Sequence, residues 1–193
     1  MTALALLERA GLAAAAAKGP ESALRALLAP MHETLGDRSG GPDLPEGVAQ
    51  FFVAGAFMVS PDAEWHMLTG NIGFPPEQTR LMIPIAGGHP GRVRASGTPL
   101  HLPDTEAGGE FKQYLKTARM GSAIYVPMVW QDRFLGQIVL AARGRNSLSV
   151  QDFATMRAAA PMAAAIWIAK GGDDWLNATY PPPEGFRVPL DGM

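Results

Sequence analysis

The 193-residue sequence predicts an α+β protein, with helices near both ends of the chain and strands between them. Residues 2–17 are rich in alanine and leucine, and residues 149–170 repeat apolar side chains with a helical period. Residues 122–130 and 134–142 are rich in β-branched side chains and flank the turn Gln131-Asp132-Arg133. This arrangement predicts a β-hairpin.

The N-terminal part of the chain is expected to form two helices and a linker. The first helix covers residues 2–17 and stops at Gly19-Pro20. The second covers residues 21–35 and carries one apolar face with i, i+3 and i+4 spacing. This face comprises Leu24, Leu27, Leu28, Met31 and Leu35. Residues 36–47 are rich in turn-forming residues, so residues 1–47 predict an extension and linker before a domain over residues 48–170.

The middle of the chain alternates between short apolar runs and turns. Strands are expected over residues 48–60, 64–69, 81–85 and 100–102, ahead of the hairpin. A short helix is expected to start at Pro90 and to end at Gly97. Proline suits the first helical position and glycine suits a left-handed helix cap. Another helix is expected over residues 111–119.

The C-terminal part begins with a long helix. Ser149 and Asp152 form a capping box that opens it, and it runs through Lys170. Its apolar stripe comprises Phe153, Met156, Ala160, Ala164 and Trp167. Residues 171–193 show no period and are expected to form an extended tail rich in proline and aromatic residues.

Composition limits the classes of function. The net charge is −2 and there is no basic run, so nothing favours binding to nucleic acid or to an anionic membrane. No apolar stretch reaches the roughly 18 residues that a bilayer requires. The chain has no cysteine, which excludes disulfides, thiolate metal sites and a cysteine nucleophile, and favours a cytoplasmic protein.

A set of small residues in a fixed order resembles the GAF domain family over about residues 21–170. The matching residues are Gly91-Arg92-Val93, Ser96-Gly97-Thr98-Pro99-Leu100, Asp104, Gly121-Ser122, Val126-Pro127 and Leu135-Gly136. The resemblance implies a central antiparallel sheet of five or six strands. It further implies that the terminal helices, including residues 21–35, pack on one face and that a ligand pocket lies on the other. Since no output domain follows residue 170, we expect a stand-alone member.

This sequence lacks features that several known GAF subfamilies require, and this limits the kinds of ligand that are expected. Free methionine-sulfoxide reductases of this family need cysteines, and phytochrome-like members usually anchor a bilin through cysteine; this chain has none. Covalent bilin attachment is therefore excluded. The Asn-Lys…Phe…Asp-Glu motif of cyclic-nucleotide-binding members is not found either. We expect a non-covalent small molecule whose identity the sequence does not reveal.

The segment Gly87-Gly88-His89-Pro90-Gly91 is the first candidate for a ligand site. Free N–H groups at a helix start favour an anion or another polar ligand. The alternative is that these glycines only permit a tight turn. The predicted ligand-binding residues are Gly87, Gly88, His89, Arg92, His66 and Asp104. For the histidines the alternative is an ordinary polar residue, and for Asp104 it is a solvated acidic loop shared with Glu106 and Glu110.

The tail carries apolar anchors around Pro181-Pro182-Pro183, which is unusual for a disordered segment. These anchors are Trp175, Tyr180, Phe186 and Leu190. They predict docking on the chain's own domain, on a second subunit or on a larger protein partner. A homodimer is expected through the terminal helices, with Ala159 and Ala163 available for close contact with a second subunit.

The function that these observations favour is a sensory or regulatory protein that binds a small molecule and acts through a partner. One alternative is a structural accessory subunit with a vestigial pocket, whose tail and helices bind a larger complex. The other is a cysteine-free enzyme on the same fold. A co-purified small molecule would support the first reading, and a stable complex without ligand dependence would support the second.

Overall fold

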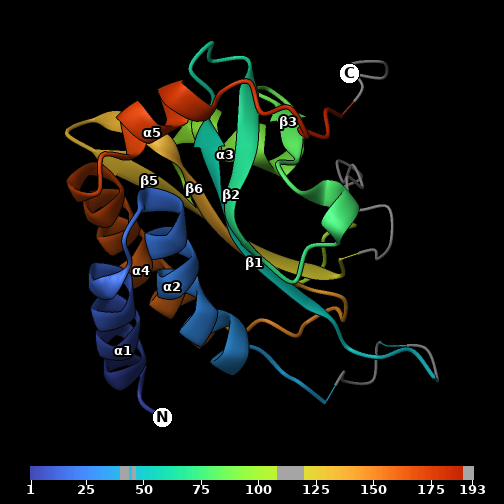
Figure 1. Ribbon diagram of the computed structural model, residues 1–193. Helices are drawn as coiled ribbons and strands as arrows, with labels where there is room; N and C mark the ends of the chain where they lie inside the picture. Colours follow the sequence, from blue (N-terminus) through green and yellow to red (C-terminus); the bar gives the residue numbers. More distant parts are fainter. Residues whose placement is uncertain (40–43, 45–46, 108–119, 189–193) are drawn as a thin grey trace.

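The computed structural model describes residues 1–39, 44, 47–107 and 120–188 (Figure 1). Within them, six strands form one antiparallel sheet in the order β3-β2-β1-β6-β5-β4. The strands are β1 (Phe52–Val59), β2 (Trp65–Ile72), β3 (Met82–Pro84), β4 (Leu100–Leu102), β5 (Ser122–Trp130) and β6 (Arg133–Ala142). The helices are α1 (Ala3–Ala16), α2 (Pro20–Thr34), the 3-10 helix η1 (Pro76–Gln78), α3 (Gly88–Ser96), α4 (Val150–Ala169) and α5 (Gly172–Thr179). The expected fold class is confirmed.

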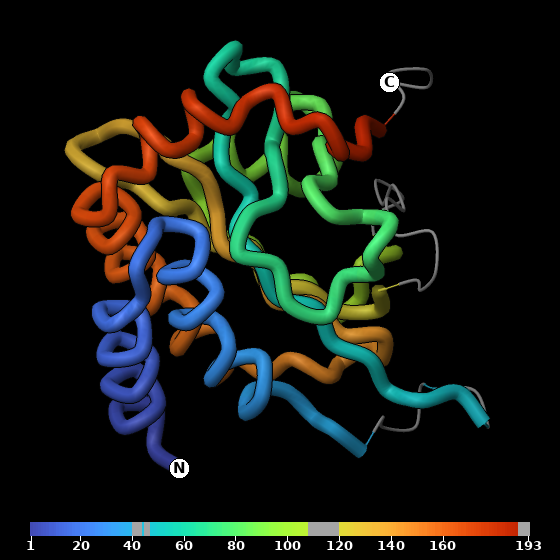
Figure 2. Tube along the Cα trace, viewed as in Figure 1, coloured from blue at the N-terminus to red at the C-terminus, as the bar shows by residue number. Residues whose placement is uncertain are grey.

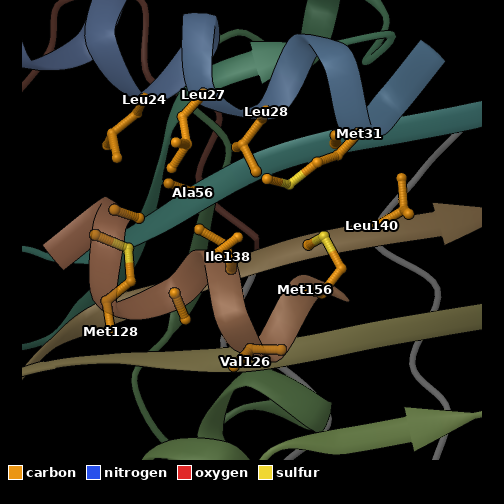
Figure 3. Packing of buried hydrophobic residues seen from close by; sticks show 14 of the residues in the cluster. Leu24, Leu27, Leu28, Met31, Ala56, Val126, Met128, Ile138, Leu140 and Met156 are labelled. Atoms are coloured by element: carbon orange, nitrogen blue, oxygen red, sulfur yellow. The ribbon is translucent and has the colours of Figure 1, made fainter. Parts of the chain in front are cut away.

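Helices α1, α2 and α4 group together on one side of the sheet (Figure 1). The apolar face of α2 points at the central strands, where Leu27 and Leu28 lie close to Ala56 of β1 (Figure 3). Met156 of α4 belongs to the same cluster, together with Ile138 of β6. Burial of each large aliphatic side chain stabilises the fold by about 1.5–3 kcal/mol. This layer is the main core of the protein.

Local signals that the sequence predicts are present at the ends of the helices. The Ser149 Oγ accepts from the Asp152 N–H at 3.1 Å, and Asp152 Oδ2 accepts from the Ser149 N–H at 2.7 Å, so the capping box is confirmed. Gly97 caps α3 with a left-handed φ of 64°. The hairpin turn is shorter than expected, because only Gln131 and Asp132 separate β5 from β6, and both have positive φ. Such a two-residue turn matches the twist of the flanking strands.

Among the differences from the sequence-based expectation, two concern where an element begins and one concerns the tail. Strand β1 begins at Phe52, four residues later than expected, and α3 begins at Gly88, so Pro90 is its third residue. Proline is tolerated there, because the first N–H groups of a helix have no intrahelical acceptor. The expectation of an extended tail is wrong for residues 172–179, which form α5. The helix expected over residues 111–119 lies outside the described residues.

The faces that were expected to meet a second subunit are buried within the chain. Ala159 and Ala163 of α4 are both 0% exposed, packed in the core with α2. They are therefore not available for contact with a second copy, and that part of the dimer prediction is wrong. A homodimer itself stays a prediction and would need another surface. Among the described helices, none is both long and apolar enough to cross a membrane.

Candidate ligand site beneath helix α3

The second face of the sheet carries its own apolar clusters. Side chains alternate between the two faces of a strand, so Phe57 of β1, Leu68 of β2 and Val139 of β6 point away from the main core and pack together. The same cluster contains Leu81 and Ile83, with Phe74, Tyr125, Phe186 and Val188 packed against it. Helix α3 packs on β5 and β6. A ligand site on this face would therefore lie between the sheet and α3.

The glycines at the start of α3 allow this helix to pack closely against the preceding residues 84–86. The Gly87 N–H donates to the Pro84 carbonyl at 2.7 Å, and Gly88 has a φ of 54°, which favours glycine. A Cβ on Gly91 would lie 2.3 Å from the carbonyl carbon of Ala86. These contacts account for the glycines by backbone geometry, which favours the tight-turn alternative over an anion site.

His66 lies on β2 and points toward this face, with 0% of its surface exposed. Its Nε2 lies 3.1 Å from the Ile85 carbonyl oxygen. Since a carbonyl oxygen only accepts, Nε2 carries the proton, and Nδ1 of the neutral ring is an acceptor. Nδ1 is buried without a hydrogen-bond partner among the described residues. Burial lowers the pKa of His66 to about 4, a shift that the Ile85 hydrogen bond opposes and the charge of Arg94 on α3 favours.

Gln137 of β6 supplies a second buried acceptor. It is 0% exposed and its Nε2 donates to the Pro90 carbonyl of α3 at 3.2 Å. Its Oε1 has no hydrogen-bond partner in the described part of the chain. Gln137 pairs with Phe57 across β1 and β6, so it lies beside the apolar cluster. Nearby on the same face, the ring of His89 lies 5.8 Å from that of Tyr125.

The structure brings only part of the predicted site together. Gly87, Gly88 and His89 open α3, whereas Arg92 is exposed on the same helix. Asp104 follows β4 at the opposite end of the sheet from His66. There its Oδ1 accepts from the Glu106 N–H at 2.9 Å and lies 3.5 Å from Arg145 Nε.

Gln137 was missed by the sequence reasoning. Its signal is a single amide inside the apolar strand Phe134–Ala142, which is visible in the sequence but does not reveal a role. Whether any of these residues binds a ligand stays a prediction.

A cleft of about 320 Å³ lies elsewhere, on the helical side of the sheet. The start of β6, the turn after β1, the end of α4 and α5 line it. None of the predicted ligand residues contributes to it. It is therefore separate from the site beneath α3.

The buried His66 predicts a pH-dependent stability. Unfolding returns His66 to its ordinary pKa of about 6.5, so between pH 6.5 and about 4 the unfolded state binds more protons. The free energy of unfolding is therefore unaffected by His66 above pH 6.5, and it falls by about 3 kcal/mol as the pH falls toward 4. Urea unfolding at pH 7.5 and 4.5 should show a smaller loss for His66→Gln than for the natural chain. Equal losses would contradict it.

Comparison with known proteins agrees with this architecture. The GAF domain model matches residues 19–167. The GAF domain of a phosphoenolpyruvate-protein phosphotransferase from Coxiella burnetii has a TM-score of 0.71 at 20% identity, with 88% of this chain and 96% of that chain covered. The corresponding Acinetobacter domain also has a TM-score of 0.71, at 12% identity, with 88% and 94% covered.

An enzyme is also among the similar structures. A free methionine-R-sulfoxide reductase from Neisseria meningitidis, solved in complex with its substrate, has a TM-score of 0.70 at 18% identity, with 89% and 91% covered. At these identities the structures share a fold with this chain and nothing finer. Comparison with curated proteins gives no significant match. The GAF model covers residues 19–167, which is most of the chain, and the chain therefore belongs to the GAF domain family.

Proposed function

We propose that this protein is a sensory or regulatory GAF module that binds a small molecule non-covalently beneath α3 and acts through a partner protein. Membership of the family supports a sensory or regulatory role in general. The lack of cysteine is consistent with a cytoplasmic protein.

The observation that carries the proposal is the pair of buried acceptors, His66 Nδ1 and Gln137 Oε1. A buried polar atom without a hydrogen bond costs about 1–3 kcal/mol. Such atoms in a native fold call for an explanation, and a ligand or a water is one. Each of these two atoms is held in place, because Nε2 of the same side chain donates to a backbone carbonyl.

The chemistry of these atoms indicates the class of ligand. Both can only accept, so the matching ligand presents N–H or O–H donors, as amines, amides and alcohols do. Apolar side chains beside them, such as Phe57, favour a ligand with an apolar body. An anion without donors does not satisfy either atom. The site therefore favours a donor-bearing ligand over the anion that the glycine-rich helix start predicts.

A thermal-shift screen tests this proposal with matched compounds. Each amine, amide or alcohol is paired with an analogue of the same shape in which the donor is replaced by a methyl group. At about 100 times Kd a ligand stabilises the native state by about 2.7 kcal/mol, which raises Tm by several degrees. Shifts confined to the donor-bearing members support the proposal. A broad screen with no shift, or equal shifts within pairs, would contradict it.

Gln137→Met tests the role of the second acceptor. Methionine keeps a similar volume but removes the amide, so ligand affinity should fall at least about tenfold, or about 1.4 kcal/mol. Stability should change by only about 1 kcal/mol, since the bond to Pro90 is lost while the unpaired acceptor is removed as well. Isothermal calorimetry and urea unfolding measure the two effects. Gln151→Met, on an exposed position of α4, is the matched control.

One observation favours the accessory-subunit alternative. Phe186 and Val188 from the C-terminal part of the chain pack against the apolar cluster on the α3 side, where a ligand body would lie. If this packing is permanent, the face is filled and the pocket is vestigial. A stable partner complex that forms without any small molecule, together with a negative thermal-shift screen, would select this alternative.

A further inference from the structure

The C-terminal segment crosses from one side of the sheet to the other. It leaves the core at α5 and passes the turn between β1 and β2, and it then reaches β3 (Figure 2). At the turn, the Tyr180 hydroxyl donates to Asp62 Oδ2. Burial, followed by this hydrogen bond, raises the pKa of Tyr180 to about 12. Tyr180 is thus one fixed point of the segment, and the next lies on β3.

Residues Phe186 to Val188 pair with the outer edge of β3. The Met82 N–H donates to the Phe186 carbonyl at 2.7 Å, and the Val188 N–H donates to the Met82 carbonyl at 3.0 Å. The pairing is parallel and is centred on Arg187. Without this segment, both backbone groups of Met82 would lie unpaired at a sheet edge, which is a template for binding another strand.

The side chains of this segment alternate as a strand requires. Phe186 and Val188 pack against the apolar cluster that contains Leu68, while Arg187 lies over the ring of Trp65 at 5.8 Å. Just before them, Gly185 lies against the end of the Met82 side chain, because a Cβ on Gly185 would lie 2.3 Å from Met82 Cε. The edge of β3 therefore selects an aromatic residue, a basic residue and a β-branched residue in order.

The attachment of the segment is weak by comparison with a central strand. The two backbone hydrogen bonds to Met82 contribute about 1 kcal/mol net each. Phe186 and Val188 are only half-buried, and Arg187 is exposed. Pro181-Pro182-Pro183 ahead of the segment have no N–H group and form no ladder with the sheet. The segment can therefore leave β3 without unfolding the central sheet, at a cost of a few hydrogen bonds and two half-buried side chains.

We propose that the outer edge of β3 is a docking site for an extended peptide segment of a partner protein, which residues 185–188 occupy as an internal competitor. The partner segment runs parallel to β3 and places apolar side chains two residues apart on either side of a basic one. Strand addition of this kind draws affinity from main-chain hydrogen bonds and specificity from alternate side chains. The proposal does not require a ligand beneath α3.

The competition sets the strength of binding in trans. A tethered segment acts at an effective concentration of roughly millimolar. A partner segment of equal affinity must be present above this concentration to displace the tail of the natural chain. A chain with a weakened tail binds the same segment at a lower concentration. Docking would also free the C-terminal residues, which gives the protein two distinguishable states.

The test uses the full-length chain and a labelled peptide of residues 180–188, YPPPEGFRV, as the probe. The tail variant Phe186→Ser/Val188→Ser leaves every residue of β3 and α3 unchanged. It should bind the probe at least about tenfold more tightly than the natural chain, because the internal competitor is weakened. Val150→Ser, at a side chain 73% exposed on α4, is the control and should match the natural chain. A probe with serine at both apolar positions should not bind.

Amide exchange provides a second readout that does not depend on probe affinity. The Met82 N–H should exchange faster in the tail variant and regain protection when the probe is added. Equal protection of Met82 in the variant and the natural chain, or equal probe affinity for both, would overturn the proposal. So would a concentration-dependent dimer that the tail variant abolishes, because the occupant in trans would then be a second copy. A negative ligand screen leaves these measurements unaffected, so the two proposals fail separately.

Discussion

Replacing Trp167 by alanine is expected to lower the free energy of unfolding by about 3–5 kcal/mol, the range for an aromatic residue deleted from a core. Trp167 is 0% exposed near the end of α4. Its Nε1 donates to Asp173 Oδ1 at 3.0 Å, and its ring meets that of Trp175 edge-on at 5.9 Å. A Cβ on Gly172 would lie 2.2 Å from the indole. The side chain thus joins α4 to α5, and its loss also removes the support of α5.

Urea unfolding measures this effect, and amide exchange in residues 172–179 shows whether α5 loosens first. Trp130→Ala is the matched control, because Trp130 is 37% exposed at the end of β5 and should cost much less. Similar midpoints for the two variants would contradict the prediction. So would undiminished protection of α5 in Trp167→Ala, since α5 would then be held by other contacts.

The elements that the sequence predicts well are those whose signals are local. The leucines of α2 repeat with a helical period, and the period alone places Leu24 and Leu28 on one face. The capping box fixes the start of α4 from two residues that are three positions apart. The hairpin follows from two β-branched runs and a short turn. For each of these, the residues that decide the structure lie within a few positions of one another.

Helix α5 could not be predicted in the same way. Its sequence is short and is followed by three prolines, which suggest an extended chain. What stabilises it is burial of Leu176, 6% exposed, and the contact of Trp175 with Trp167. Isolated helices of this length are marginal in water, so tertiary packing decides. The same reason explains why docking of the tail was expected but its helical part was not.

The candidate site shows a similar division. His66 was named from the sequence as a candidate ligand-binding residue. Gln137 carries a comparable signal, but its role depends on Pro90, 47 positions earlier in the chain. The Ile85 carbonyl accepts from His66 and the Pro90 carbonyl accepts from Gln137. These two bonds decide which atom of each side chain remains unpaired. Ligand chemistry of that kind requires the tertiary structure.

Replacing Gly91 by alanine separates two physical effects that have opposite signs. Helix propensity alone predicts that alanine in α3 stabilises the protein by about 0.5–1 kcal/mol. The structure predicts the reverse, because the new Cβ would lie 2.3 Å from the carbonyl carbon of Ala86 and 2.5 Å from its oxygen. These are backbone atoms, so α3 itself must shift. Overpacking of this kind costs typically about 1–3 kcal/mol, and we expect Gly91→Ala near the upper end.

A shift of α3 should also damage the candidate site. It would move the Pro90 carbonyl away from Gln137 Nε2, so a donor-bearing ligand should bind Gly91→Ala at least about tenfold more weakly. Gly97→Ala, at the other end of α3, is the matched control. A Cβ there meets nothing within 4 Å, and only its left-handed backbone should cost about 1 kcal/mol. A higher melting temperature for Gly91→Ala than for the natural chain would contradict the prediction. The gain in helix propensity would then be larger than the cost of the contact with Ala86.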